Sequence, residues 1–236
     1  MLAVLTVNSQ ILDLRPGLRV LDAGCGGGRH SFEAYRRGSM ICGMDYDKTE
    51  VEKVMYSFTA ALESDRRQGG DWQVLRGDVV HLPFADQSFD RIICAEVMEH
   101  LHEDLRALAE LVRVLKPRGR MAVTVPTYFS EAANGFFSPL YFTNPGGHVR
   151  KFMPGELAAK LRHAGLRLYA VGHAHAFHSP YWLLRCAFGL RNENHPVPAT
   201  YRKFLVKTIF SPTLSRVEKY LDWVCPKSLI LYGQKP

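Results

Sequence analysis

The sequence feature that most constrains the fold is a glycine-rich turn that directly follows an apolar strand. Residues 20–28 read Val-Leu-Asp-Ala-Gly-Cys-Gly-Gly-Gly, and residues 29–37 have the pattern of a helix. Glycine permits positive φ angles and lets backbone N–H groups approach a ligand closely, and the helix N-terminus then faces that ligand. This order of strand, turn and helix predicts a loop that binds a nucleotide-type cofactor.

The spacing of the glycines separates two kinds of cofactor loop. The dinucleotide fingerprint G-x-G-x-x-G, started at Gly24 and Gly26, needs a third glycine where the chain has Arg29. The spacing D-x-G-x-G-x-G from Asp22 to Gly28 instead resembles the first motif of the class I S-adenosylmethionine (SAM) methyltransferases. This family binds a cofactor that has no pyrophosphate. The resemblance implies that Asp22, Gly24 and Gly26 position the methionine part of SAM.

Two further strands end in an acid, as they do in that family. The first strand, residues 40–45, ends in Asp45 and is followed by Tyr46, and the second leads into Asp78 and Val79. A carboxylate can accept two hydrogen bonds at once and is favoured near a cationic sulfonium. The resemblance implies that the first acid binds the ribose hydroxyls and that the second pair lies at the adenine amino group.

The most specific signal is the run over residues 82–90, Leu-Pro-Phe-Ala-Asp-Gln-Ser-Phe-Asp. It closely resembles the P-F-x-D-x-S-F-D run that precedes the fourth strand in one large subgroup of these methyltransferases. A lone glycine loop would be a weak signal, but four motifs now follow in order over residues 18–125. By the same resemblance, Ala95 at the end of the fourth strand is expected to line the cofactor site.

The alternation of apolar segments predicts an α/β fold, a Rossmann-like, doubly wound, seven-stranded sheet with right-handed crossovers, in one SAM-methyltransferase domain over residues 1–236. By resemblance, the last strand runs antiparallel. Strands are expected near residues 18–23, 40–45, 72–77, 90–95, 119–125, 166–172 and 228–235. Helices are expected near residues 28–38, 47–68, 102–115 and 154–164.

Composition and cysteine usage point to a cytoplasmic protein. The chain has 236 residues, 47% of them hydrophobic, which is enough for one full α/β core. Its five cysteines form no C-x-x-C pair, which fits a reducing compartment. Residues 1–5 are apolar but lack a basic segment before them, so they predict a helix packed beside the cofactor site and not a signal peptide.

The candidate metal-binding and catalytic residues begin in the segment over residues 94–101, Cys-Ala-Glu-Val-Met-Glu-His-Leu. If a helix begins here, Glu96, Glu99 and His100 share one face at the carboxyl edge of the sheet. The E-x-x-E-H pattern resembles the metal site of O-methyltransferases of ubiquinone biosynthesis and of small-RNA methylation. In the small-RNA enzymes a second histidine follows the fifth strand, and here His148 stands in that place. Two carboxylates with imidazoles would suit Mg²⁺ or Mn²⁺.

Two catalytic roles remain open for these residues. An aliphatic alcohol is almost wholly neutral at pH 7, and metal coordination would lower its pKa and align its oxygen with the S–CH₃ bond. Without a metal, His100 or His148 would serve as a general base, with Glu99 beside them. Metal-independent relatives also carry Glu-His at this point, where these residues cap a helix or position the substrate.

A second concentration of histidine, His173, His175 and His178, follows the sixth predicted strand. The alternate spacing of the first two would place both on one face of an extended segment, which permits a metal or substrate role. The alternative is a loop with ordinary hydrogen bonds, and we favour it.

Two regions exceed the minimal fold. Residues 126–147 are rich in aromatic residues, proline and glycine, and they predict a lid loop over the substrate. Residues 179–226 predict a helical insertion or cap between the last two strands. Residues 201–236 hold seven Lys or Arg against two acids, so this part could contact an anionic membrane surface or an acidic substrate. The alternative, which we favour, is a cap with a solvated basic face.

Together these features predict a SAM-dependent methyltransferase that methylates a hydroxyl of an apolar or glycosylated small molecule of lipid, quinone or glycan type. Peripheral contact with a membrane surface stays an open alternative to the solvated cap. A pI of about 9.2 raises the question of nucleic acid, but no RNA-binding module or dense basic stripe with stacking aromatic residues is visible, which argues against it. The alternatives are a C-methyltransferase with a histidine base, and a non-catalytic SAM-binding or lipid-surface protein.

Overall fold

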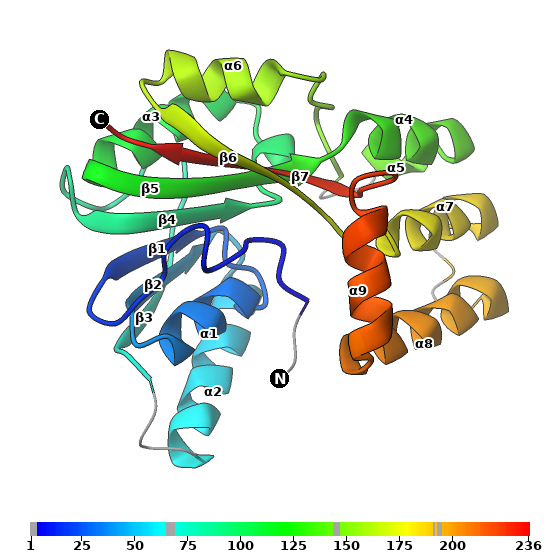
Figure 1. The fold of residues 1–236 in the computed structure, drawn as a ribbon, viewed down its shortest axis with the longest axis horizontal. Coiled ribbons are helices and arrows are strands. Elements are labelled where there is room, and N and C mark those ends of the chain that lie inside the picture. Colours follow the sequence, from blue (N-terminus) through cyan, green and yellow to red (C-terminus); the bar gives the residue numbers. More distant parts are fainter. Residues whose placement is uncertain (1–3, 65–68, 144–146, 191, 193–194) are drawn as a thin grey trace.

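The computed structural model describes residues 4–64, 69–143, 147–190, 192 and 195–236, and its centre is a single seven-stranded sheet (Figure 1). The strands are β1 (Arg19–Ala23), β2 (Met40–Asp45), β3 (Trp72–Arg76), β4 (Phe89–Ala95), β5 (Leu115–Pro126), β6 (Arg167–Ala174) and β7 (Ser228–Gln234). The helices are α1 (Arg29–Arg36), α2 (Lys48–Ser64), α3 (Asp104–Val114), α4 (Tyr128–Phe137), α5 (Leu140–Thr143), α6 (Glu156–His163), α7 (His178–Phe188), α8 (Pro196–Phe210) and α9 (Pro212–Leu221), with the 3₁₀ turn η1 (Met98–His100).

The strand order is β3-β2-β1-β4-β5-β7-β6, and the predicted Rossmann-like topology is confirmed. β1 pairs in parallel with β2 and β4, whereas β7 lies antiparallel between β5 and β6. The order therefore reverses at β1 and β4. In open α/β sheets, ligands bind beyond the carboxyl ends of the strands at such a reversal.

Two apolar cores lie on opposite faces of this sheet. Helices α1 and α2 cover one face, where Ala34 and Phe58 are fully buried. Helices α3 and α6 cover the other, where Leu108 and Leu161 are buried (Figure 1). Each helix buries only one side, which accounts for the helical spacing of the apolar residues in the sequence. The sheet is thereby held rigidly, and its carboxyl edge stays available for a site.

The start of the chain differs from the expectation. The described residues from 4 onward form turns before β1 and no helix, and residues 1–3 lie outside the description. Long-range polar contacts hold this segment instead: the Arg91 guanidinium donates to the Leu12 carbonyl at 2.8 Å and to the Asp13 carboxylate at 2.5 Å. β5 also begins four residues earlier than expected, because Leu115 directly after α3 already pairs with Phe89.

The aromatic segment over residues 126–147 was predicted as a loop, and this was wrong for most of it. Its residues form α4 and α5, and residues 144–146 lie outside the description. Thr127 caps α4 by accepting a hydrogen bond from the Ser130 N–H at 3.4 Å. Residues 179–226 contain most of α7 and all of α8 and α9, and these helices gather with α4 and α5 beyond the ends of β5, β6 and β7 (Figure 1).

Candidate active site

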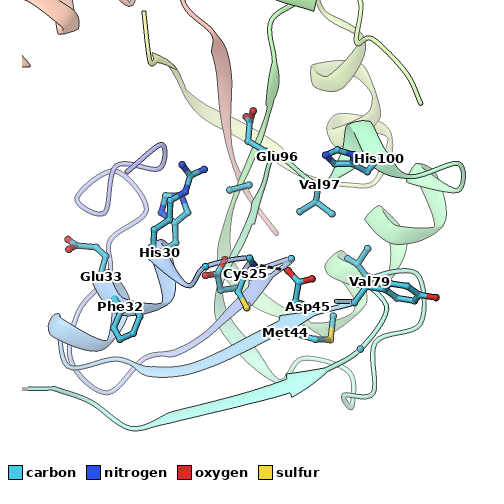
Figure 2. A pocket seen from close by; sticks show the side chains of 18 of the residues that line it. Cys25, His30, Phe32, Glu33, Met44, Asp45, Val79, Glu96, Val97 and His100 are labelled. Carbon is cyan, nitrogen blue, oxygen red and sulfur yellow. Dashed lines mark hydrogen bonds between the residues drawn. The ribbon is translucent and has the colours of Figure 1, made fainter. Parts of the chain in front are cut away.

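A cavity of about 810 Å³ lies at the carboxyl ends of β1, β2 and β4, where the strand order reverses. Glu96 and His100 lie on one side of this cavity, and Met44 and Asp45 lie on the other (Figure 2). All eight residues predicted to bind the cofactor line this cavity. They are Asp22, Gly24, Gly26, Asp45, Tyr46, Asp78, Val79 and Ala95.

The glycine loop adopts a backbone conformation that favours glycine. Gly24 has φ of 75°, and a Cβ atom there would collide with the side chain of Val97. The N–H groups of Gly24 and Cys25 donate to the Met44 carbonyl at 2.8 and 2.9 Å. The loop after β1 is thus tied to β2, and a side chain at position 24 would disturb both the tie and the cavity wall.

Asp22 brings a buried carboxylate to the cavity. Its side chain is 1% exposed, and its Oδ2 accepts a hydrogen bond from the Ser31 hydroxyl at 2.6 Å. Its Oδ1 is buried and has no hydrogen-bond partner among the described residues. Burial raises the pKa of Asp22 to about 6, against the effect of the Ser31 hydrogen bond. A buried acceptor without a donor fits the ammonium group of a bound amino acid moiety.

Asp45 and Asp78, the acids predicted to bind ribose and adenine, both line this cavity. Asp45 accepts a hydrogen bond from the Gly26 N–H at 2.7 Å, which joins the glycine loop to the end of β2. Asp78 accepts one from the Val80 N–H at 3.0 Å and thereby closes the turn after β3. Tyr46 is 68% exposed, and its ring lies under the Arg76 guanidinium at 5.6 Å. Each carboxylate is therefore held by backbone while it lines the cavity.

Glu99, His100 and His148 converge beside this cavity. One ligand atom from each lies within 4.8 Å of the others. Glu99 is 1% exposed, and both of its carboxylate oxygens are buried without a hydrogen-bond partner among the described residues. Burial, and then the neighbouring Glu96, raise the pKa of Glu99 well above its usual range. Two unpartnered oxygens beside two imidazoles are a donor set that fits a divalent cation.

Glu96, the fourth residue of the predicted metal set, does not join this cluster. Its φ is 58°, and the 3₁₀ turn begins only at Met98, so the predicted shared helical face does not form. Its carboxylate instead accepts hydrogen bonds from the Thr124 hydroxyl at 2.9 Å and from the Lys227 ammonium at 3.0 Å. Burial opposes ionisation, but the Lys227 ammonium holds the pKa of Glu96 below its usual value. The cluster that could hold a cation thus has three members, Glu99, His100 and His148.

Reasoning from sequence missed two residues behind this cluster. Lys227, directly before β7, neutralises Glu96, and Glu131 of α4 accepts a hydrogen bond from His148 at 2.7 Å. Glu131 lies in the segment predicted as a loop, and no local pattern marks it. Its only signal is an acid within an otherwise apolar and aromatic stretch.

The second group of histidines is divided between different surroundings. His175 is buried, and its Nε2 lies 2.8 Å from the Thr6 hydroxyl. His178 lies near Glu218 of α9, and these two residues with His175 form a second set of donor atoms within 4.8 Å of one another. His173 contacts the Trp223 ring at 5.0 Å between centroids. The favoured interpretation, ordinary hydrogen bonding, stays a prediction.

A second cavity, of about 500 Å³, lies between α4, α7 and the segment before α6. Its walls are mostly apolar and include Phe129, Phe152, Met153 and Leu183. Trp182 of the same helix α7 lines a different, smaller cavity, of about 160 Å³, which shares Arg29 and Glu96 with the cofactor cavity. Helix α7 thus separates an apolar space from the polar surroundings of the cofactor cavity.

Comparison with known proteins agrees with this geometry. Residues 21–123 match the family model described as a methyltransferase domain. This part of the chain is a methyltransferase domain of the class I SAM-dependent type. The matched stretch runs from β1 to β5 and contains the glycine loop, Asp45, Asp78 and Glu99.

Individual relatives resemble the chain over part of their length. Methyltransferase GfsG of Streptomyces halstedii is 35% identical over 115 residues, or 48% of this chain and 39% of that protein. The ubiquinone biosynthesis O-methyltransferase of Hahella chejuensis is 33% identical over 161 residues, or 65% of this chain and 64% of that protein. The chain therefore spans less than two thirds of either relative.

Solved structures support the fold. A SAM-dependent methyltransferase from Methanosarcina mazei has a TM-score of 0.63 at 15% identity, over 98% of this chain and 99% of that one. At this identity the likeness concerns the fold alone. Among the helices that the structure describes, none combines the length and the apolar character needed to cross a membrane.

Proposed function

We propose that the methyltransferase transfers the methyl group of SAM to a hydroxyl oxygen of an apolar or glycosylated small molecule, with Mg²⁺ or Mn²⁺ held by Glu99, His100 and His148. One observation carries this proposal: the buried Glu99 carboxylate has no partner among the described residues and lies beside two imidazoles at the edge of the cofactor cavity. An isolated buried carboxylate is costly, and a cation would offset that cost.

The residues around the cation site have separable roles. A divalent cation in this site would lower the pKa of the acceptor hydroxyl and hold its oxygen in place. His100 belongs both to the cluster and to the wall of the cofactor cavity, so the acceptor and the methyl group would meet there. Asp22, with its free Oδ1, would bind the ammonium group of SAM, and Asp45 would orient the ribose. Three protein donors leave positions open for the acceptor.

The surroundings favour an apolar or amphiphilic acceptor. Helices α4 and α5 lie in the chain between β5 and His148, and α4 carries the exposed side chains of Phe129, Phe136 and Phe137. The second cavity offers about 500 Å³ of mostly apolar wall, which lies in the range of pockets for small molecules. One relative is a ubiquinone biosynthesis O-methyltransferase, which fits this class of acceptor.

The test is transfer of labelled methyl from SAM into a metabolite extract, with and without EDTA, followed by partition between organic and aqueous phases. We expect label in the organic phase, and we expect EDTA to remove it. The variant Glu99→Gln should keep the SAM affinity of the wild type and lose transfer, whereas Asp45→Ala should lose SAM binding. Full turnover by Glu99→Gln would contradict the proposal.

A second candidate function, C-methylation with a histidine base, rests on His100. Burial, and then the neighbouring His148, lower the pKa of His100, so its imidazole is neutral at pH 7 and can accept a proton. On this alternative, EDTA leaves the labelled product unchanged and His100→Ala removes it. The absence of label in both phases, together with measurable SAM binding, would favour a non-catalytic SAM-binding protein.

A further inference from the structure

Glu131 is a buried carboxylate that the catalytic proposal does not use. It lies on α4, is 1% exposed, and uses both of its oxygens. Oε1 accepts a hydrogen bond from the Tyr141 hydroxyl at 2.8 Å, and Oε2 accepts one from His148 Nδ1 at 2.7 Å. No Lys or Arg pairs with it among the ion pairs of the described residues. A buried acid held by two ring side chains, without a cationic partner, calls for a functional reason.

The hydrogen bond to Glu131 decides which nitrogen of His148 is available. Because Nδ1 carries the proton that it donates to the carboxylate, Nε2 keeps the lone pair. The His148 ring lies edge-to-face with the His100 ring at 4.8 Å between centroids, within the cluster that contains Glu99. Nε2 is therefore the His148 nitrogen that can bind a cation in that cluster.

We infer that Glu131 is the positioning residue of the cation site: it fixes the tautomer and the ring orientation of His148 so that Nε2 is presented beside Glu99 and His100. This inference rests on the proposed function. Histidines that bind a metal commonly donate their other N–H to a carboxylate, which orients the ring and raises its basicity. The Glu131 carboxylate, 2.7 Å from His148 Nδ1, supplies both the orientation and the basicity.

The same contact joins the cation site to the helices beyond the sheet. Glu131 comes from α4 and Tyr141 from α5, and the Tyr141 ring contacts the Trp182 ring of α7 at 6.0 Å between centroids. The hydroxyl of Tyr141 thus holds the second oxygen of Glu131 while its ring faces α7. The orientation of His148 consequently depends on how α4, α5 and α7 pack.

The test is Mn²⁺ binding by the full chain, measured as the loss of the electron paramagnetic resonance signal of free Mn²⁺. We expect Glu131→Gln, which removes the charge but keeps the size, to weaken Mn²⁺ binding by roughly 10- to 100-fold. Glu131→Asp should restore part of the affinity. The matched control is Tyr141→Phe, which removes the other hydrogen bond to the same carboxylate but keeps the ring against α7 and the contact between Glu131 and His148. It should change Mn²⁺ affinity by less than about threefold.

A second readout separates positioning from folding. In the wild type, ¹⁵N chemical shifts should show His148 protonated at Nδ1, and Glu131→Gln should shift it toward a mixture of tautomers while SAM affinity stays unchanged. Wild-type Mn²⁺ affinity in Glu131→Gln would overturn the role of Glu131 and leave the cation site standing. Failure of the wild type to bind Mn²⁺ would overturn the cation site, and the role of Glu131 with it.

Discussion

At the scale of single residues, the protonation of Asp22 should govern cofactor binding. Burial raises its pKa to about 6, so the carboxyl is largely protonated below that pH and cannot attract an ammonium group. We therefore expect SAM affinity to rise as the pH increases through about 6, by up to about tenfold per pH unit below it for a single proton. Calorimetric titration of SAM between pH 5 and pH 7.5 measures this, and Asp22→Asn should bind weakly with a flat profile.

Stability without SAM should show the opposite trend. Because the pKa of Asp22 is higher in the folded chain than the ordinary value of 3.8, its contribution to folding is fully present below about pH 4 and is lost as the pH rises through about 6. The difference in unfolding free energy between wild type and Asp22→Asn should therefore change by about 3 kcal/mol over this range. A constant difference from pH 4 to pH 7 would contradict the burial argument.

At the scale of elements, the pair of Glu96 and Lys227 joins the end of β4 to the start of β7. The two side chains are 19% and 14% exposed. Lys227→Met would leave the Glu96 carboxylate buried without its counterion, and we expect it to lower the unfolding free energy by about 3 kcal/mol. Chemical denaturation measures this loss. The double variant Glu96→Gln with Lys227→Met should recover most of it, and a single-variant loss below about 1 kcal/mol would mean that water compensates the charge.

At the scale of the whole molecule, helix α8 presents an exposed face that carries basic and apolar side chains. Its members are Arg202, Lys203, Val206, Lys207 and Phe210, all exposed and spaced by three or four residues. The sequence predicted a cap with a solvated basic face, and this face also exposes apolar side chains, because Val206 and Phe210 are 50% and 66% exposed. Such a face suits an anionic membrane surface.

We therefore expect the protein to co-sediment with vesicles that contain anionic lipid, and high salt should weaken this binding. Replacing Val206 and Phe210 with Gln should reduce the bound fraction several-fold without lowering the melting temperature, because both side chains face solvent. The control is Tyr56→Gln, which removes an exposed apolar side chain from α2. Equal binding to neutral vesicles would exclude an electrostatic contribution.

Much of this fold could be predicted from the sequence, because short local patterns mark each strand. The seven strands were placed within one or two residues apart from the start of β5, since short apolar runs bounded by glycine, proline and acids fit few alternatives. That the predicted cofactor residues line one cavity was predictable for a related reason. Gly24 with its positive φ and Asp45 at the end of β2 occupy positions that only certain residue types can fill.

The sequence by itself determined the order of the elements, the topology of the sheet and the edge at which the cofactor residues meet, because these depend on periodicity and on turn chemistry within short stretches. Only the tertiary structure decided which residues gather at the proposed cation site. Lys227 binds Glu96 across 131 residues of sequence, and Glu131 contacts His148 from a helix that aromatic composition had suggested to be a loop. The reason is physical: the partner of a buried charge is chosen by three-dimensional proximity, which no local pattern records.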